Sequence, residues 1–187
     1  MASGPHEIEI KLAVKDARSA RLLLRRAGFR VSRPRVFEAN TVFDTPGHRL
    51  RKSSRLLRIR TAGGLSTLTY KGKPVGGRHK IREELEVKIP DPATMRQIVE
   101  RVDFRPMFRY EKYRTEFRMP GRAGVAVLDE TPIGVYLELE GTSHWIDRTA
   151  KLLGFSESDY ITASYGRLYL EWCKAKRHKP GDMVFKA

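Results

Sequence analysis

Charged side chains recur at every second position in most segments of this chain that could form strands. In HEIEIKL, residues 6–12, Glu7, Glu9 and Lys11 alternate with three aliphatic residues. In KIREELEVKI, residues 80–89, five charged residues share one parity. A period of two is typical of a strand with one apolar and one charged face. Any fold of this chain must therefore bury the apolar faces and satisfy dense rows of charge on the other side.

Short turn sequences separate the candidate strands and favour an antiparallel sheet. The separators DTPG, AGG, PVGG, MPGRAG and ETPIG are rich in turn-forming residues. The strands are expected at 6–13, 36–44, 55–62, 66–73, 80–89, 110–118, 124–130 and 134–140. Eight strands joined in this way are expected to close into a barrel, because closure removes exposed edges.

Four amphipathic segments are predicted to be helices. They lie at 15–29, 90–102, 142–155 and 162–177. Asp16 and Asp91 are placed as N-caps, and Gly28 and Gly154 as stop signals. Their apolar stripes need an apolar partner, which the apolar strand faces supply. The predicted fold is α+β and mainly β: a closed eight-stranded antiparallel barrel with helices packed outside. The alternative is an open sheet with helices inside and the charged faces in water.

The length and the charge limit the classes of partner. A chain of 187 residues is expected to form one domain over 1–187, with its core at about 5–177 and a basic tail that frays. Lys and Arg number 37 against 22 Asp and Glu, a net charge of +15. Such an excess indicates nucleic acid, a membrane surface or a phosphorylated small molecule, unless it only aids solubility.

The sequence contains few indications of the cellular compartment of the protein. The single Cys173 excludes an intramolecular disulfide and fits a reducing compartment. No apolar run approaches the length of a membrane-spanning helix, and the N-terminus lacks a hydrophobic signal core. We therefore expect a cytoplasmic protein that does not bind membranes. Its five histidines are scattered and are expected at the surface.

If the charged faces point into the barrel, the interior cannot be a dry core, because unpaired buried charge is very costly. A wet tunnel that holds a charged ligand is expected instead. Nine basic residues are placed inside: Lys11, Arg58, Arg60, Lys71, Lys73, Arg82, Lys88, Lys112 and Arg114. They suit a chain of phosphates. The neighbouring carboxylates would repel that ligand unless Mg²⁺ or Mn²⁺ lay between them.

Eight segments in order resemble a known family. They are HEIEIKL, NTVFDTPGHRL, LLRIR, TLTYKG, REELEVKI, YEKYRTEF, VLDETPIGVYLELEG and ITASYGRLYLEW. The first resembles the Glu-x-Glu-x-Lys signature of the CYTH superfamily, the triphosphate tunnel metalloenzymes. That signature alone is weak, but the ordered series covers most of the chain. Known members include inorganic, thiamine and RNA triphosphatases and class IV adenylyl cyclases.

The resemblance implies a divalent cation, a triphosphate substrate and roles for matching residues. The implied metal ligands are Glu7, Glu9, Glu138 and Glu140. The implied phosphate-binding residues are Lys11, Arg58, Arg60, Lys71, Arg82, Lys112 and Arg114. Asp129 would help to hold or orient the metal or its water. Val42 departs from the family pattern, because many members have Tyr there, so any Tyr-assisted mechanism is in doubt.

Hydrolysis is the preferred reaction. Glu84, Glu86 or Asp129 would orient water, and Lys71 would stabilise charge on the phosphates as well as bind them. The alternative is a class IV adenylyl cyclase that makes cyclic AMP from ATP. Non-catalytic capture of polyphosphate is a weaker alternative, and nucleic acid is not expected except through a 5′-triphosphate end. A homodimer is compatible with the sequence. Tyr165 either closes one tunnel mouth or packs its helix.

Overall fold

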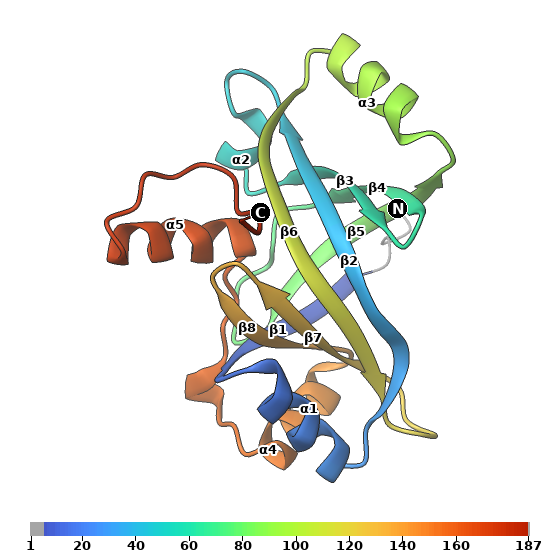
Figure 1. Ribbon diagram of the computed structural model, residues 1–187, viewed down its shortest axis with the longest axis vertical. Helices are drawn as coiled ribbons and strands as arrows, with labels where there is room; N and C mark the ends of the chain where they lie inside the picture. The colour runs from blue at the N-terminus through green and yellow to red at the C-terminus, as the bar shows by residue number, and fades with distance from the viewer. Residues whose placement is uncertain (1–5, 187) are drawn as a thin grey trace.

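Eight antiparallel strands close into a barrel, as predicted (Figure 1). The computed structural model describes residues 6–186. The strands are β1 (His6–Val14), β2 (Arg30–Asp44), β3 (Leu56–Ala62), β4 (Leu65–Lys71), β5 (Lys80–Ile89), β6 (Arg105–Arg118), β7 (Val125–Thr131) and β8 (Gly134–Glu140). Their order around the barrel is β1-β5-β4-β3-β2-β6-β7-β8, and β1 closes it by pairing with both β5 and β8.

The predicted helices are present, and one short helix was missed. The helices are α1 (Ala17–Arg26), α2 (Arg49–Lys52), α3 (Pro92–Arg101), α4 (Ser143–Leu152) and α5 (Tyr165–Ala175), with a 3-10 turn, η1, at Glu157–Asp159. Asp16 and Asp91 cap α1 and α3 as expected. Asp44 accepts from the backbone amides of Leu50 and Arg51, which fixes α2 after the DTPG segment. None of the helices within residues 6–186 has the length and apolar character needed to cross a bilayer.

Two helices cover the outer wall and leave the charged faces inside. In Figure 1, α1 and α4 lie together at the end of the molecule near β1, β7 and β8. Their shared core contains Ile10, Leu12, Leu24, Leu128, Leu137, Leu139 and Ile146. Full burial of such a side chain contributes about 1.5–3 kcal/mol. This core fixes the orientation of β1 and β8, because a one-residue slip would turn their charged residues outward.

Helix α5 does not lie on the outer wall. It packs against Val42, Tyr110 and Tyr136, which belong to the inward-facing rows of β2, β6 and β8. Tyr165 and Tyr169 of the helix are buried in this aromatic cluster. The inward rows change from charged to apolar here, so α5 closes this end of the barrel.

The C-terminal tail is ordered, contrary to the prediction that it frays. Met183 is 1% exposed, its amide donates to the Arg109 carbonyl and its carbonyl accepts from the Glu111 amide, both at 2.9 Å. The pairing of β7 with β6 begins only at Tyr113. The tail therefore covers the free edge of β6 beyond β7, where an unpaired edge would otherwise be exposed.

The helices leave part of the barrel wall in water. Leu85 and Val87, on the outer face of β5, are 48% and 56% exposed. The apolar strand faces were expected to pack against helices, and these two residues do not. Helix α3 packs instead near β3, with Val99 against Ile59 and Phe43.

Candidate functional site

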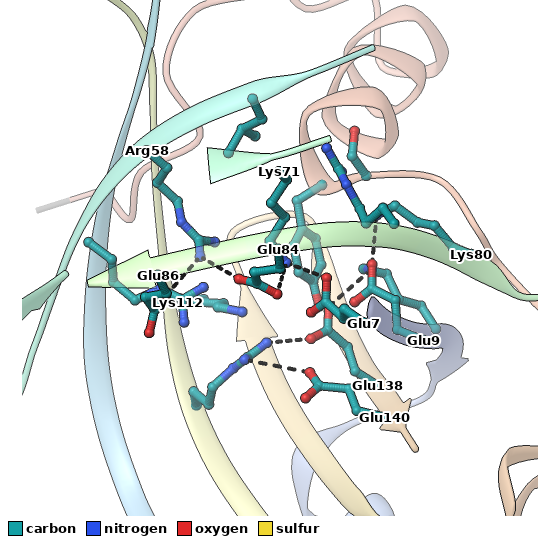
Figure 2. A pocket seen from close by; sticks show the side chains of 17 residues that line it. Glu7, Glu9, Arg58, Lys71, Lys80, Glu84, Glu86, Lys112, Glu138 and Glu140 are labelled. Atoms are coloured by element: carbon teal, nitrogen blue, oxygen red, sulfur yellow. Dashed lines mark hydrogen bonds and ion pairs between the residues drawn. The ribbon is translucent and has the colours of Figure 1, made fainter. Parts of the chain in front are cut away.

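The inward faces of the strands line one cavity of about 300 Å³ (Figure 2). Its wall consists of Glu7, Glu9, Lys11, Leu56, Arg58, Arg60, Lys71, Lys80, Arg82, Glu84, Glu86, Lys112, Arg114, Glu138, Glu140, Ser164 and Tyr165. The structure thus brings all the predicted site residues together. Asp129 alone among them does not line the cavity, since it is fully buried behind Lys112 and Arg114.

Three carboxylates converge at one side of the cavity. Glu7, Glu9 and Glu140 each offer an oxygen within 4.8 Å of the others. The pairing of β1 with β8 sets Glu9 opposite Glu140. Burial, together with the nearby carboxylates, raises the pKa of Glu140 to about 8, and burial and Glu9 raise that of Glu7. Crowded carboxylates of this kind suit a divalent cation, because Mg²⁺ and Mn²⁺ prefer oxygen ligands.

Glu138, the fourth predicted metal ligand, lies outside the group of three converging carboxylates. Its carboxylate lies 3.1 Å from Lys11 Nζ and accepts a short hydrogen bond from Arg114. Burial alone would raise the pKa of Glu138, but Lys11 and Arg114 hold it well below its ordinary value. Glu138 is therefore neutralised by protein cations. Glu7 and Glu9 also pair with lysines, but together with Glu140 they form a group of converging oxygens that does not include Glu138.

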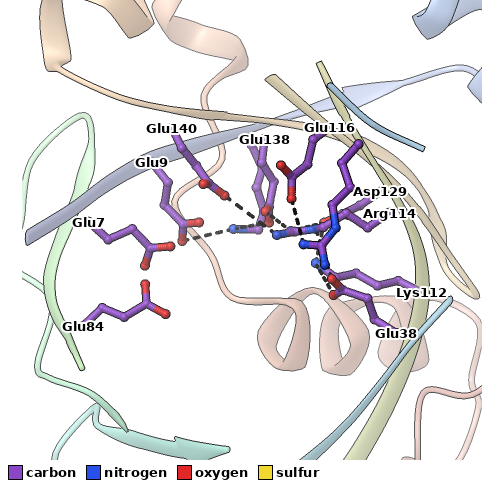
Figure 3. Close-up of polar contacts among 12 residues, drawn as sticks. Glu7, Glu9, Glu38, Glu84, Lys112, Arg114, Glu116, Asp129, Glu138 and Glu140 are labelled. Carbon is purple, nitrogen blue, oxygen red and sulfur yellow. Dashed lines mark hydrogen bonds and ion pairs between the residues drawn. The ribbon is translucent and has the colours of Figure 1, made fainter. Parts of the chain in front are cut away.

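Asp129 has both of its oxygens engaged (Figure 3). It accepts two hydrogen bonds from Arg114 at 2.7 and 2.8 Å and one from Lys112 at 2.7 Å. The Tyr165 hydroxyl donates a fourth at 2.8 Å. An acceptor so fully occupied fixes the positions of its partners. The geometry suits an orienting group better than a free base.

The basic residues differ in how firmly carboxylates hold them. Arg82 donates to the Gly72 carbonyl at 3.1 Å and makes no ion pair within 4.0 Å in the described part of the chain. Arg58 donates to the Tyr110 hydroxyl at 2.9 Å, and its carboxylate neighbours Glu84 and Glu86 are 4.0 and 3.9 Å away. Arg58 also donates to the Thr69 hydroxyl at 3.2 Å. Among the basic residues described on the cavity wall, Arg82 is therefore the one that an anion can reach without displacing a carboxylate.

Glu84 and Glu86 lie on β5, and Glu84 shares Lys71 with Glu7. Lys71 Nζ is 2.5 Å from Glu7 and 3.0 Å from Glu84. Burial opposes ionisation of Glu84, yet Lys71 lowers its pKa overall. Thr69 donates to Glu86 at 2.7 Å. Both side chains line the cavity.

Two buried charged residues were missed from the sequence. Lys80 lies 2.6 Å from Glu9. It shares the parity of Arg82 and Glu84 in β5, and this pattern could have predicted that it points inward. Glu38 is 1% exposed and lies 3.4 Å from Arg60 and 3.7 Å from Lys112. Burial would raise the pKa of Glu38, but Lys112 and other cations lower it to about 2. The nearest residues of the same parity in β2 are Val36, Asn40 and Val42, so no charged row revealed Glu38.

Two predicted inward residues lie elsewhere, and the interior charge is balanced. Lys73 and Lys88 are exposed and do not line the cavity. The basic residues inside are Lys11, Arg58, Arg60, Lys71, Lys80, Arg82, Lys112 and Arg114, and the acidic ones are Glu7, Glu9, Glu38, Glu84, Glu86, Asp129, Glu138 and Glu140. The two sets are equal in number. The net charge of +15 therefore belongs to the outer surface.

Known proteins resemble this chain in sequence and in fold. A Methanocaldococcus jannaschii protein, whose name proposes an adenylate cyclase, is 31% identical over 147 residues, which cover 79% of this chain and 83% of the relative. A Vibrio parahaemolyticus structure, also described as a proposed adenylate cyclase, has a TM-score of 0.76 at 18% identity and covers 88% of this chain and 98% of its own.

A third similar structure comes from Hippeastrum and is described as a proposed adenylyl cyclase with a dominant triphosphatase activity. Its TM-score is 0.66 at 23% identity, over 88% of this chain and 95% of its own. The two structural likenesses establish the fold. The family follows from the sequence, because residues 5–186 match the CYTH domain. The chain is thus a member of the CYTH domain family.

Proposed function

We propose that this protein is a metal-dependent triphosphatase that hydrolyses a triphosphate bound in the barrel cavity. The observation that carries the proposal is the convergence of Glu7, Glu9 and Glu140 in the same cavity as Arg58 and Arg82. CYTH proteins are metal-dependent enzymes that act on triphosphates, as triphosphatases or as cyclases. The carboxylates fit a metal and the guanidinium groups fit phosphate, so the cavity has a place for both.

The cavity residues have separable roles in this proposal. A divalent cation held by Glu7, Glu9 and Glu140 would neutralise phosphate oxygens. Arg58 and Arg82 bind the phosphate chain and stabilise the charge that develops on it. Lys11, Arg60, Lys71, Lys112 and Arg114 complete the basic wall.

Glu84 or Glu86 orients the attacking water and takes up its proton. The water oxygen forms a bond to the terminal phosphorus as the bond to the bridging oxygen breaks, which releases phosphate and the shortened chain. Asp129 keeps Lys112 and Arg114 in place for this step. Glu138 does the same for Lys11 and Arg114.

An inorganic tripolyphosphate suits this wall better than a nucleotide. Tyr165 and Leu56 are the aromatic and aliphatic side chains on the wall, and the Tyr165 hydroxyl is bound to Asp129. A nucleobase pocket ordinarily provides apolar surface and a few polar groups for the base edge. Thiamine triphosphate and nucleoside triphosphates would leave their organic groups outside this charged region.

A cyclase is the second candidate, because the names of two similar proteins point to it. Cyclisation would use the same phosphate-binding residues, with a ribose hydroxyl in place of water. It would also need a site for adenine next to the cavity. The triphosphatase activity named for the Hippeastrum protein supports hydrolysis.

The test is a phosphate-release assay with tripolyphosphate, thiamine triphosphate and ATP, each with Mg²⁺ and with Mn²⁺, while cyclic AMP is measured in parallel. We expect release of phosphate, fastest from tripolyphosphate, and no cyclic AMP. Efficient conversion of ATP to cyclic AMP with intact tripolyphosphate would replace the hydrolase with the cyclase.

A further inference from the structure

Asp147, on α4 outside the barrel, gathers donors from two separate segments. Its Oδ2 accepts from Arg78 at 2.9 Å. Its Oδ1 lies 2.7 Å from His79 Nε2 and accepts from the Tyr160 hydroxyl at 3.1 Å. The His79 side chain is only 6% exposed, so the expectation that all histidines lie at the surface was wrong. Glu157 accepts a further bond from Arg78 at 3.3 Å.

Both segments lead directly to residues of the cavity. His79 precedes Lys80, which binds Glu9 at 2.6 Å. Tyr160 lies five residues before Tyr165, the cavity residue that donates to Asp129. Asp147 itself does not line the cavity. Any influence it has on the site must therefore pass through these two segments.

The two segments meet where one strand pairing of the barrel ends. The pairing of β1 with β5 stops at Glu9 and Lys80. Beyond it, Lys11 pairs instead with Ile161 through two backbone hydrogen bonds of 2.8 and 2.9 Å. The chain around Ile161 thus completes the wall next to β1. We call this place the seam, defined as residues 78–80 and 160–161 against Glu9 and Lys11.

We propose that Asp147 is a positioning residue that holds the seam closed and thereby sets Lys80, Lys11 and Tyr165 in the cavity. The Asp147 carboxylate joins the start of β5 to the segment before α5 through three donors, whereas Glu157 receives only one bond, from Arg78. Without Asp147, His79 and Tyr160 lose their shared partner, and the two segments keep only the exposed Arg78–Glu157 bond and the contact between the His79 and Tyr160 rings. Small displacements of catalytic groups have large kinetic effects, because reaction rates depend steeply on geometry.

Hydrogen exchange tests the structural half of this inference without reference to any reaction. In Asp147→Ala, we expect the backbone amides of Lys11 and Ile161 to exchange at least about ten times faster than in the wild type. Asp147→Asn keeps one carbonyl acceptor and should give an intermediate rate. The matched control is Asp91→Ala, which removes the side-chain hydrogen bonds of an exposed carboxylate at α3 and should leave these two amides unchanged.

The kinetic half rests on the proposed function. With tripolyphosphate and Mg²⁺, Asp147→Ala should lower kcat at least about tenfold, Asp147→Asn less, and Asp91→Ala not at all. Unchanged exchange in Asp147→Ala, or faster exchange with unchanged hydrolysis, would overturn the inference. If the wild type hydrolyses no triphosphate, the proposed function fails, and the exchange rates alone decide whether Asp147 holds the seam.

Discussion

Some carboxylates in the cavity each pair with two basic side chains, and an anionic ligand would bind to the same basic side chains. Glu9 lies 3.3 Å from Lys11 and 2.6 Å from Lys80. Removing one partner of a buried pair costs about 3–5 kcal/mol, because the other charge is left uncompensated. A metal that takes Glu9 therefore leaves two lysines in need of an anion. Phosphate oxygens supply it, so metal and phosphate should favour each other's binding.

The carboxylate charge of Glu9 is directly testable. Glu9→Gln keeps the size of the side chain but removes the negative charge, and we expect kcat for tripolyphosphate to fall at least about a hundredfold. Extra Mg²⁺ should restore it only in part. The matched control is Glu171→Gln, whose carboxylate is 58% exposed and pairs with Arg167 on α5. Equal activity in the two variants would contradict the assignment of Glu9.

Arg82 is the cavity cation with the freest guanidinium group, so its loss should be felt in substrate binding. A charge-assisted hydrogen bond contributes about 1.5–3 kcal/mol. Arg82→Ala should therefore lower kcat/KM roughly ten- to hundredfold, mainly through KM if the contact is equal in ground and transition states. Arg26→Ala, on the exposed face of α1, should change neither constant. A wild-type KM in Arg82→Ala would remove Arg82 from the phosphate site.

The low pKa of Glu38 makes a specific prediction for acid unfolding. Its pKa falls from an ordinary value of 4.5 to about 2 in the folded chain. Above about pH 4.5 the group is ionised in both states and its contribution to stability is complete. As the pH falls toward 2, the unfolded chain takes up the proton first, and this contribution, on the order of a few kcal/mol, is lost.

Urea unfolding at pH 6, 4 and 3 measures this loss. The free energy of unfolding should fall less steeply with pH in Glu38→Gln than in the wild type. Glu171→Gln should reproduce the wild-type slope. Parallel slopes for the wild type and Glu38→Gln would show that Glu38 is not held ionised by its neighbours.

Among the elements, the C-terminal tail carries a testable share of stability. Met183 is 1% exposed within the aromatic cluster of α5. Truncation of a buried side chain to alanine costs about 2–5 kcal/mol. Met183→Ala should lower the free energy of unfolding by that amount, measured by urea titration. Met107→Ala, at a side chain that is 38% exposed, should cost much less. Equal costs would mean that the tail does not pack on β6.

The strands could be predicted because their pattern has one dominant period. The alternation in β1 and β5 fixed which residues share a face, and the apolar stripes of α1 and α4 indicated that the charged face points inward. The pattern says nothing about where a barrel ends. Lys88 has the parity of Arg82 but is exposed toward the end of β5, and the inward rows of β2 and β6 become apolar where α5 closes the barrel.

Other features depend on contacts that no local pattern records. The basic composition of the tail predicted fraying, whereas Met183 pairs with Tyr110, which lies far away in sequence. Helix α2 forms because Asp44 accepts backbone amides six and seven residues later. The sequence did not indicate that Glu38 belongs to the site, because its partners come from β3 and β6. In each case the decisive partner is supplied by the tertiary structure.

At the scale of the whole molecule, a cavity with equal numbers of basic and acidic side chains lies within a strongly basic protein. The equal numbers of basic and acidic residues inside leave little net attraction for a bare polyanion. The outer excess of charge raises the local concentration of anions but does not hold one in the barrel. A triphosphate should therefore need a divalent cation for tight binding.

Calorimetric titration of tripolyphosphate into Glu84→Gln, a variant expected to turn over slowly, measures this dependence. We expect binding in Mg²⁺ to be at least about tenfold tighter than in EDTA, which corresponds to about 1.4 kcal/mol. By linkage, tripolyphosphate should raise the affinity for Mg²⁺ by the same factor. Equal affinity for tripolyphosphate with and without Mg²⁺ would show that the carboxylates do not act through a metal.

The most direct test of metal-dependent hydrolysis is the rate of phosphate release from tripolyphosphate by the wild-type protein, first in excess EDTA and then after Mg²⁺ or Mn²⁺ is restored. The convergence of Glu7, Glu9 and Glu140 in a cavity lined by Arg58 and Arg82 predicts no turnover in EDTA and full recovery with the metal. Undiminished release of phosphate in EDTA would contradict metal-dependent hydrolysis.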